Sequence, residues 1–177
     1  MYQIFPERFN NSRSELNPET VVPWGSKSKR LEFQGGDLYG VIEKLDYIQD
    51  LGVNIVYLNP IFLSNSIHKY DTWDHFQVDP HFGGNEALEE LINELHKREM
   101  KIVLDCSLNH VHPRNFAFQD LIVNGENSKY KDWFTVDSFP VRLKYRPHLY
   151  ANTYKVGWDG NQEEYTSEQE GVCPDYV

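Results

Sequence analysis

The chain has 177 residues, enough for one ordinary domain, and 40% of them are hydrophobic, which is enough for a packed core and excludes wholesale disorder. The formal net charge of −10 argues against a nucleic acid partner, because phosphate binding needs clustered Lys and Arg. No apolar run approaches the roughly 18 residues that a membrane span requires, so we expect no membrane partner either.

The N-terminal third of the sequence predicts one strand, one loop and one helix. A short apolar strand at residues 2–5 is stopped by Pro6. Residues 10–34 are polar and predict a long loop. Asp37 is well placed to cap a helix whose apolar residues recur at helical spacing, and Gly52 ends this helix.

Two further strands and a second helix follow. Residues 53–58 and 101–105 are apolar runs typical of buried strands. Between them lie a loop at 62–84 and an amphipathic helix with Asn85 as its predicted N-cap. This order predicts right-handed βαβ units with parallel strands, and the continuous apolar runs predict a sheet covered on both faces. From residue 111 onward no clear period remains, which predicts an irregular subdomain.

The N-terminus and the cysteines bear on the cellular compartment. Residues 1–6 lack the basic and long apolar stretches of a signal peptide, so we predict a cytoplasmic protein. The two cysteines, Cys106 and Cys173, are too few for a disulfide framework, and we interpret both as reduced and structural.

Polar and aromatic side chains follow each of the three predicted strands, at residues 6–9, 68–75 and 105–112. In parallel α/β folds, ligand groups collect at the carboxyl ends of the strands. The recurrence therefore predicts a ligand site at this edge. The aromatic content of 14% suits stacking on a flat ligand, and the acidic balance suits a neutral one such as a sugar.

Five blocks of sequence carry a more specific signal, at residues 2–9, 33–38, 52–60, 68–74 and 105–110. The last block, which reads Asp-Cys-Ser-Leu-Asn-His, has the form D-x-x-x-N-H. This short motif alone is weak, but five blocks in the right order and spacing are specific. Together they resemble the α-amylase family, glycoside hydrolase family 13, in its cyclomaltodextrinase, neopullulanase and maltogenic amylase branch.

The resemblance implies an α/β fold, a partial (β/α)8 TIM barrel made of the first three βα units. Residues 1–110 would form this N-terminal part of the catalytic barrel. Residues 111–177 would form an incomplete domain B, the irregular insertion that the family carries after strand three. A complete barrel needs about 250 residues, so we expect the C-terminal barrel half to be the missing partner of this chain.

The resemblance also implies a function, the hydrolysis of α-1,4-glucosidic bonds in cyclodextrins, maltooligosaccharides, starch or pullulan with retention. Tyr70 matches the ring that stacks under the sugar at the cleavage subsite. His110 matches the residue that hydrogen-bonds the 6-hydroxyl of that sugar and stabilises the transition state, and His68 lines the same subsite. The implied framework of the site consists of Asp74, Asp105 and Asn109.

The resemblance assigns the catalytic carboxylates of the reaction to no residue of this chain. A retaining glycosidase needs two of them, roughly 5 Å apart. The family carries its nucleophile and general acid after strands four and five, which would lie beyond Val177. We therefore expect residues 1–177 to hold an α-glucan or maltooligosaccharide without cleaving it.

Homo-oligomer formation is a further hypothesis.

No cofactor is required by the implied chemistry, but calcium is a hypothesis. Asn11, Gly35 and Asp37 match part of an oxygen-ligand pattern found in some members of the branch. Arg13 falls about where a ligating Asp would be expected, and its charge disfavours a cation there.

Two other readings of the sequence stay open. The first is a non-catalytic α-glucan-binding or structural module derived from the same fold, which would keep Tyr70 and His110 and need no acid or nucleophile. The second is a metal-dependent hydrolase, because His110 and His112 form an H-x-H pair and His binds zinc. Such a site would need further ligands on later strands.

Overall fold

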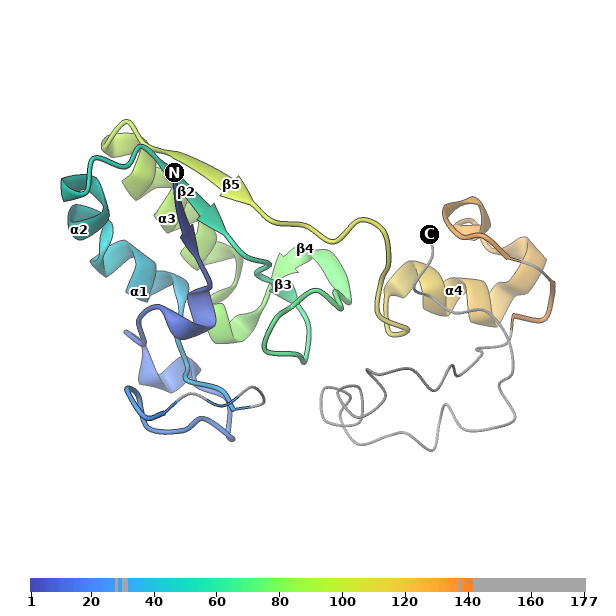
Figure 1. Cartoon of the computed structure of the whole chain (residues 1–177). Coiled ribbons are helices and arrows are strands. Elements are labelled where there is room, and N and C mark those ends of the chain that lie inside the picture. Colours follow the sequence, from blue (N-terminus) through green and yellow to red (C-terminus); the bar gives the residue numbers. More distant parts are fainter. Residues whose placement is uncertain (28, 30–31, 137, 142–177) are drawn as a thin grey trace. The chain divides into compact units, whose positions relative to one another are not determined.

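The computed structural model describes residues 1–27, 29, 32–136 and 138–141, and these residues belong to two compact units (Figure 1). Unit 2 has the described residues from Ser107 onward together with two loop pieces, Ser64–Ser66 and Tyr70–Asp74. Unit 1 has the remainder, from Met1 to Cys106. The predicted division at residues 110 and 111 stays a prediction, and residues 142–177 of the predicted domain B lie outside the described residues.

A parallel sheet of three strands is the centre of unit 1. Its order is β1 (Tyr2–Ile4), β2 (Ile55–Leu58) and β5 (Lys101–Leu104). In the register, Tyr57 of β2 lies opposite both Gln3 of β1 and Val103 of β5. The parallel pairing of strands that are consecutive in the sheet confirms the predicted βαβ arrangement.

The first crossover contains two short helices where a single helix was predicted. They are α1 (Leu38–Glu43) and α2 (Leu45–Asp50). Lys44 separates them with φ −101° and ψ 7°, and its N–H donates to the carbonyl of Val41 at 3.0 Å. This three-residue spacing tightens the turn and interrupts the α-helical ladder. Asp37 caps α1 as predicted, because its carboxylate accepts a hydrogen bond from the N–H of Gly40.

The second crossover helix is α3 (Gly84–Lys97), and the prediction of Asn85 as its N-cap is wrong. The cap residue is Gly83, whose φ of 98° is a left-handed conformation that glycine adopts without strain. The Asn85 side chain instead accepts from the N–H of Val78 at 2.8 Å and donates to the carbonyl of Phe76 at 3.2 Å. It therefore holds the strand before the helix.

The segments that were predicted as loops contain short regular elements. The strand held by Asn85 is β4 (Asp74–Val78), and it pairs with β3 (Phe62–Leu63) in a sheet of two strands. Three 3-10 helices complete unit 1: η1 (Pro6–Arg8), η2 (Ser14–Leu16) and η3 (Pro80–Phe82).

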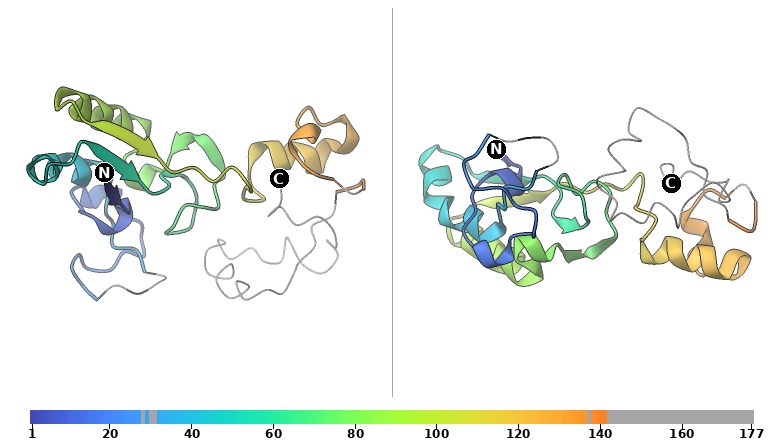
Figure 2. Two further views of the ribbon diagram at one scale, coloured as in Figure 1. Left: turned by 45° about the horizontal axis from the view of Figure 1, so that its top comes forward. Right: turned by 90° about the horizontal axis from the view of Figure 1, so that it is seen from below.

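The core of unit 1 lies between the sheet and its helices, and α1 packs beside α3 (Figure 2). Val41, Leu58 and Leu91 have no exposed surface, and burial of each such side chain stabilises the fold by about 1.5–3 kcal/mol. The opposite face of the sheet differs from the prediction. Val103 on β5 is 39% exposed, so among the described residues the sheet is covered on one face.

Unit 2 contains a helix where an irregular chain was predicted. Helix α4 (Phe116–Asn124) begins after Asn115, whose side chain accepts from the N–H of Ala117 and caps it. Two 3-10 helices follow, η4 (Gly125–Asn127) and η5 (Lys131–Trp133). None of the helices in the described part of the chain has the length and apolar character that crossing a membrane requires.

Candidate sugar-binding site

Asp105 follows β5, where the predicted framework of the site begins. Its N–H donates to the carbonyl of Leu58 at 2.9 Å, which extends the sheet ladder by one residue. Tyr57 of β2 hydrogen-bonds to the Asp105 carboxylate. Desolvation raises the pKa of Tyr57, and this hydrogen bond raises it further. The phenol therefore stays protonated at neutral pH and donates to Asp105, which fixes the carboxylate at the strand end.

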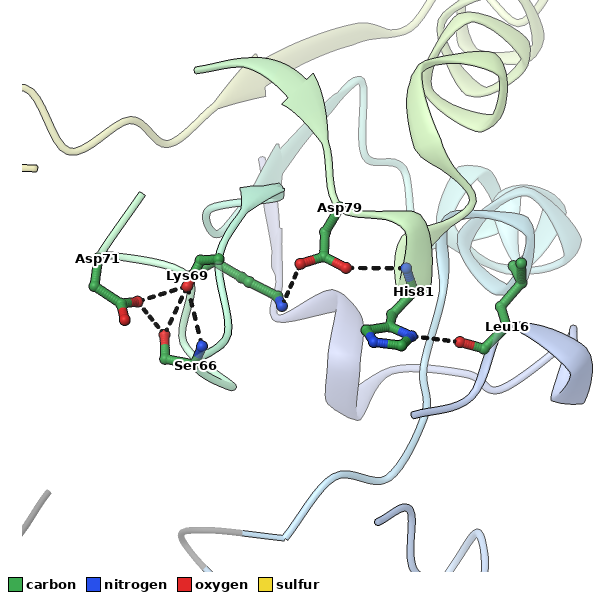
Figure 3. A network of polar contacts seen from close by, with 7 residues as sticks. Leu16, Ser66, Lys69, Asp71, Asp79 and His81 are labelled. Carbon is green, nitrogen blue, oxygen red and sulfur yellow. Dashed lines mark hydrogen bonds and ion pairs between the residues drawn. The ribbon is translucent and has the colours of Figure 1, made fainter. Parts of the chain in front are cut away.

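His68 and its neighbour Lys69 lie in the loop between β3 and β4, within unit 1. The His68 side chain is exposed, whereas Lys69 is 1% exposed. The Lys69 ammonium lies 2.6 Å from the carboxylate of Asp79, so the buried charge is paired (Figure 3). The sequence motif predicted a role for His68 but not for Lys69. The burial of Lys69 could not be predicted, because a lysine in a polar loop is usually exposed.

Glu7, directly after β1, is a second buried charge. One carboxylate oxygen accepts from the backbone N–H groups of Gln34 and Gly35, and the other lies 2.7 Å from the Arg8 side chain. Burial raises the pKa of Glu7, and the opposing effects of these N–H groups, Arg8 and Lys69 do not cancel the rise. Glu7 therefore organises the loop after β1 rather than facing a ligand.

His110 lies in unit 2, in a small network with two neighbours. Its Nδ1 is 2.9 Å from Asn109 Oδ1 and 3.2 Å from Ser107 Oγ. An amide oxygen can only accept, so the contact with Asn109 favours a proton on Nδ1 in the neutral ring. The Nε2 atom then has a lone pair that can accept from a hydroxyl group, or a proton to donate when the ring is charged. Asn109 thus orients the ring that the motif singles out.

Within unit 2, the loop of Tyr70 is hydrogen-bonded to the segment that follows His110. The N–H of His112 donates to the carbonyl of Thr72 at 3.1 Å, and this bond lies two residues beyond each of the two predicted sugar-binding residues. The Asn115 side chain also donates to the carbonyl of Trp73 at 2.9 Å. The sequence predicted that residues 68–75 and 105–112 share one edge of the sheet, but no pattern in it predicted these hydrogen bonds.

Side-chain contacts reinforce the connection. The rings of Trp73 and His112 have centroids 5.4 Å apart, and the Arg114 guanidinium lies 5.0 Å from the Trp73 ring centroid. Cation–π pairs of this kind contribute about 0.5–1 kcal/mol at exposed sites and more when they are desolvated. The loop of Tyr70 and the segment after His110 are therefore held together by backbone and side chains alike.

The loop before Trp73 has its own support. The carboxylate of Asp71 accepts from the hydroxyl of Ser64 at 2.6 Å. It also accepts from the hydroxyl of Ser66 (Figure 3). Tyr70 itself is half-buried, as is Asp74. Of the predicted site residues, unit 2 contains Tyr70, Asp74, Asn109 and His110, and unit 1 contains His68 and Asp105. Their roles stay predictions.

The residues proposed for calcium do not fit a calcium cage. One oxygen of Asp37 accepts from the N–H groups of Ser12 and Arg13 at 2.9 and 2.8 Å, and the other caps α1. Asn11 donates its amide to the carbonyl of Gln34 at 3.1 Å. Calcium takes six to eight oxygen ligands, and here the carboxylate oxygens are directed at backbone donors.

The zinc reading finds no further ligands among the residues that the structure describes, where no group of three or more His, Cys, Asp or Glu side chains could hold a metal ion. His112 Nδ1 accepts from the N–H of Arg114 at 3.0 Å, which commits that ring nitrogen. Cys106 is a free, half-buried thiol whose pKa is raised by desolvation and by Asp105. Cys173 lies outside the described residues.

The chain is similar in sequence to several named proteins. A family profile described as "Alpha amylase, catalytic domain" matches residues 3–170. The chain is 53% identical over 141 residues to the intracellular maltogenic amylase of Bacillus subtilis (strain 168), covering 79% of this chain and 24% of that protein. It is 50% identical over 151 residues to the cyclomaltodextrinase of Thermoanaerobacter pseudethanolicus, covering 85% and 26%. It thus spans about a quarter of the length of these relatives.

Solved structures agree with the sequence matches. Cyclic alpha-maltosyl-(1→6)-maltose hydrolase from Arthrobacter globiformis, in complex with maltose, superposes with a TM-score of 0.73 at 45% identity and covers 82% of this chain and 34% of that chain. The type III pullulan hydrolase from Thermococcus kodakarensis gives 0.69 at 40% identity, covering 81% and 29%. Together with the parallel strands, these neighbours confirm the predicted fold class of a partial (β/α)8 barrel.

Proposed function

The chain belongs to the alpha-amylase family, and from this membership we propose that the protein hydrolyses α-1,4-glucosidic bonds of cyclodextrins, maltooligosaccharides, starch or pullulan with retention. Residues 1–177 supply the surface that holds the reacting sugar. The names of the relatives support this substrate class, since they include a maltogenic amylase, a cyclomaltodextrinase and a hydrolase solved with maltose.

Three residues lie at the sugar in this proposal. Tyr70 stacks its ring under the sugar, because a phenol has an apolar face that covers the C–H groups of a pyranose. His110 hydrogen-bonds the 6-hydroxyl through Nε2, and Asn109 keeps the ring in the orientation that frees this atom. His68 lines the same subsite. Asp74 and Asp105 belong to the framework.

The observation that carries the proposal is the hydrogen bond from the N–H of His112 to the carbonyl of Thr72. It ties the loop of Tyr70 to the segment of His110 within one compact unit. Two residues that act on a single sugar must be supported by a common framework, since displacement of about 1 Å weakens directional contacts strongly. The fixed connection between the two loops is the support that this role needs.

The carboxylates that cleave the bond are not assigned to any residue of 1–177. By the family pattern they follow the fourth and fifth barrel strands, whereas the parallel sheet described here consists of β1, β2 and β5. Asp105 and Asp74 keep framework roles. A non-catalytic α-glucan-binding module is the second candidate, and turnover decides between the two. Release of maltose or glucose by the complete protein supports the hydrolase, and binding without any product supports the module.

Binding by the 177-residue chain tests the sugar site itself. We expect maltotriose to bind weakly in isothermal titration calorimetry, and Tyr70→Ala and His110→Ala each to weaken binding about tenfold, or roughly 1.4 kcal/mol. Matched controls are Tyr47→Ala on α2, where the ring is 54% exposed, and His96→Ala in the last turn of α3. Equal affinity of all four variants, or no binding by the wild type, would contradict the proposal.

A further inference from the structure

Lys69 has an unusual backbone conformation. Its φ of 61° is left-handed, which residues other than glycine rarely adopt because Cβ crowds the neighbouring carbonyl. Among the described residues Glu99, with φ 55°, shares this feature, but Glu99 is an exposed residue just after α3. At a buried residue, such a conformation is held by the side chains packed around it. The contacts of the buried Lys69 side chain therefore show which residues hold this backbone conformation.

The Lys69 side chain runs into the interior of unit 1. Its ammonium lies 2.6 Å from Asp79 Oδ2, and the side chains of the pair are 2% and 3% exposed (Figure 3). The ammonium also lies 5.5 Å from the ring centroid of Phe82 and 5.9 Å from that of Phe33. Burial raises the pKa of Glu7, and the charge of Lys69 partly opposes this rise. Lys69 is therefore the cation of a buried cluster with two carboxylates.

Asp79, the anchor of this pair, is fixed by its own contacts. Its Oδ1 accepts from the N–H of His81 at 2.9 Å and so caps η3, and its N–H donates to the carbonyl of Ile61 at 2.9 Å. His81 in turn contacts the carbonyl of Leu16 through Nδ1 at 2.7 Å (Figure 3). The ammonium is thus bound to a rigid point and not to a mobile surface carboxylate.

The two residues beside Lys69 are those that the proposed function places at the sugar. His68 is exposed and Tyr70 is half-buried, whereas Lys69 between them is buried. The buried side chain of Lys69 therefore fixes the backbone between two residues that are predicted to contact the substrate. A change of Lys69 to an ordinary negative φ would rotate the chain there by roughly 120°. Such a rotation would redirect the peptides on both sides of it.

We propose that Lys69 is a positioning residue of the sugar site, whose ion pair with Asp79 holds the left-handed turn that presents His68 and Tyr70 to the substrate. The proposal rests on the proposed function, because the orientation of these two side chains matters only if they contact a sugar. Lys69 itself does not touch the sugar and acts through its neighbours.

The experiment separates positioning from stability with a double variant of the 177-residue chain. Lys69→Met removes the ammonium that lies 2.6 Å from the buried Asp79 carboxylate, and this variant loses much of its stability or fails to fold. Lys69→Met combined with Asp79→Asn leaves neither charge alone and keeps an acceptor for the N–H of His81. We therefore expect the double variant to regain most of the lost melting temperature.

The double variant should not regain function. We expect its affinity for maltotriose to stay at least tenfold below that of the wild type, and hydrogen exchange of the peptide covering residues 66–71 to stay faster. Lys69→Arg, which keeps the charge, should restore part of the affinity. Lys97→Met, which removes an exposed lysine paired with Glu94, should change neither readout.

Wild-type affinity and wild-type exchange in the double variant would overturn the proposal and leave Lys69 a purely structural residue. The two readouts also distinguish this failure from that of the proposed function. If the wild-type chain binds no maltotriose, the proposed function fails, whereas unchanged exchange at 66–71 in the double variant refutes the role of the ion pair in the turn.

Discussion

Glu7 shows how one buried carboxyl can shape the loop that follows a strand. It receives the N–H groups of Gln34 and Gly35, and the Arg8 guanidinium next to it also donates to the carbonyl of Glu32 at 2.6 Å. The side chain is 2% exposed, so its charged form has lost most of its hydration. The carboxyl therefore links the residues after β1 to residues 32–35 at the expense of a raised pKa.

This raised pKa makes a prediction for the pH dependence of folding. A carboxyl whose pKa is higher in the folded chain than its ordinary 4.5 contributes stability that is complete below about pH 4.5 and is lost as the pH rises through the folded value. Glu7→Gln keeps an oxygen that accepts the two N–H groups but cannot ionise. The wild type should therefore lose stability relative to Glu7→Gln between pH 4.5 and neutrality.

Urea unfolding at several pH values between 4 and 7 measures this difference, with Glu86→Gln as the control because Glu86 is exposed in the first turn of α3. A wild type that gains stability relative to Glu7→Gln over the same interval would refute the account of this carboxyl. The control pair should show no such trend.

At the scale of single residues, the sequence could predict those that belong to a motif. Asp37 stands before a helical period, and the structure confirms it as a cap. Tyr70 and His110 stand in blocks with recognisable order and spacing, and their roles stay predictions. Glu7 and Lys69 could not be predicted as buried, since polar residues in polar loops are usually solvated. Their burial depends on contacts with residues that are distant along the chain, such as Gln34 for Glu7.

At the scale of elements, Gly40 determines how closely α1 approaches the loop after β1. A Cβ added at Gly40 would lie 2.0 Å from the carbonyl oxygen of Asn10, and the same oxygen accepts the N–H of Asp37 at 3.1 Å. The absence of a side chain lets the helix and the loop share this contact. A glycine inside a helix is otherwise unfavourable by about 1 kcal/mol.

We therefore expect Gly40→Ala to destabilise the chain by about 2 kcal/mol, although helix propensity alone predicts stabilisation. Denaturant unfolding measures the change. Gly25→Ala is the control, because Gly25 has a φ of +80° and no atom within 4 Å of an added Cβ, so its cost is limited to about 1 kcal/mol of backbone strain. Stability of Gly40→Ala at or above that of the wild type would show that the close approach is not required.

The elements also show which patterns carry structural information. The apolar runs predicted β2 and β5 and the periodicity predicted α3, because long-range burial leaves its mark on consecutive residues. The break at Lys44 and the diversion of Asn85 to β4 were not predictable. The break at Lys44 and the contacts of Asn85 both depend on hydrogen bonds that compete with the regular helical ones. The spacing of apolar residues along the sequence does not show such competition.

At the scale of the whole molecule, the order of five blocks indicated the barrel class, and the parallel sheet with its structural neighbours confirms it. The sequence after residue 111 offered no period, and so α4 was missed. Of the predicted site residues, His68 and Asp105 belong to unit 1, and Tyr70 and His110 belong to unit 2. What joins the loop of Tyr70 to the segment of His110 is the hydrogen bond between His112 and Thr72.

The central claim is that Tyr70 and His110 hold the same glucose unit. Intermolecular nuclear Overhauser effects between maltotriose and the aromatic protons of the chain test it most directly. We expect cross-peaks from the Tyr70 and His110 rings to a single glucose residue of the bound sugar. Cross-peaks from only one of these rings, or only from aromatic residues elsewhere on the chain, would contradict it.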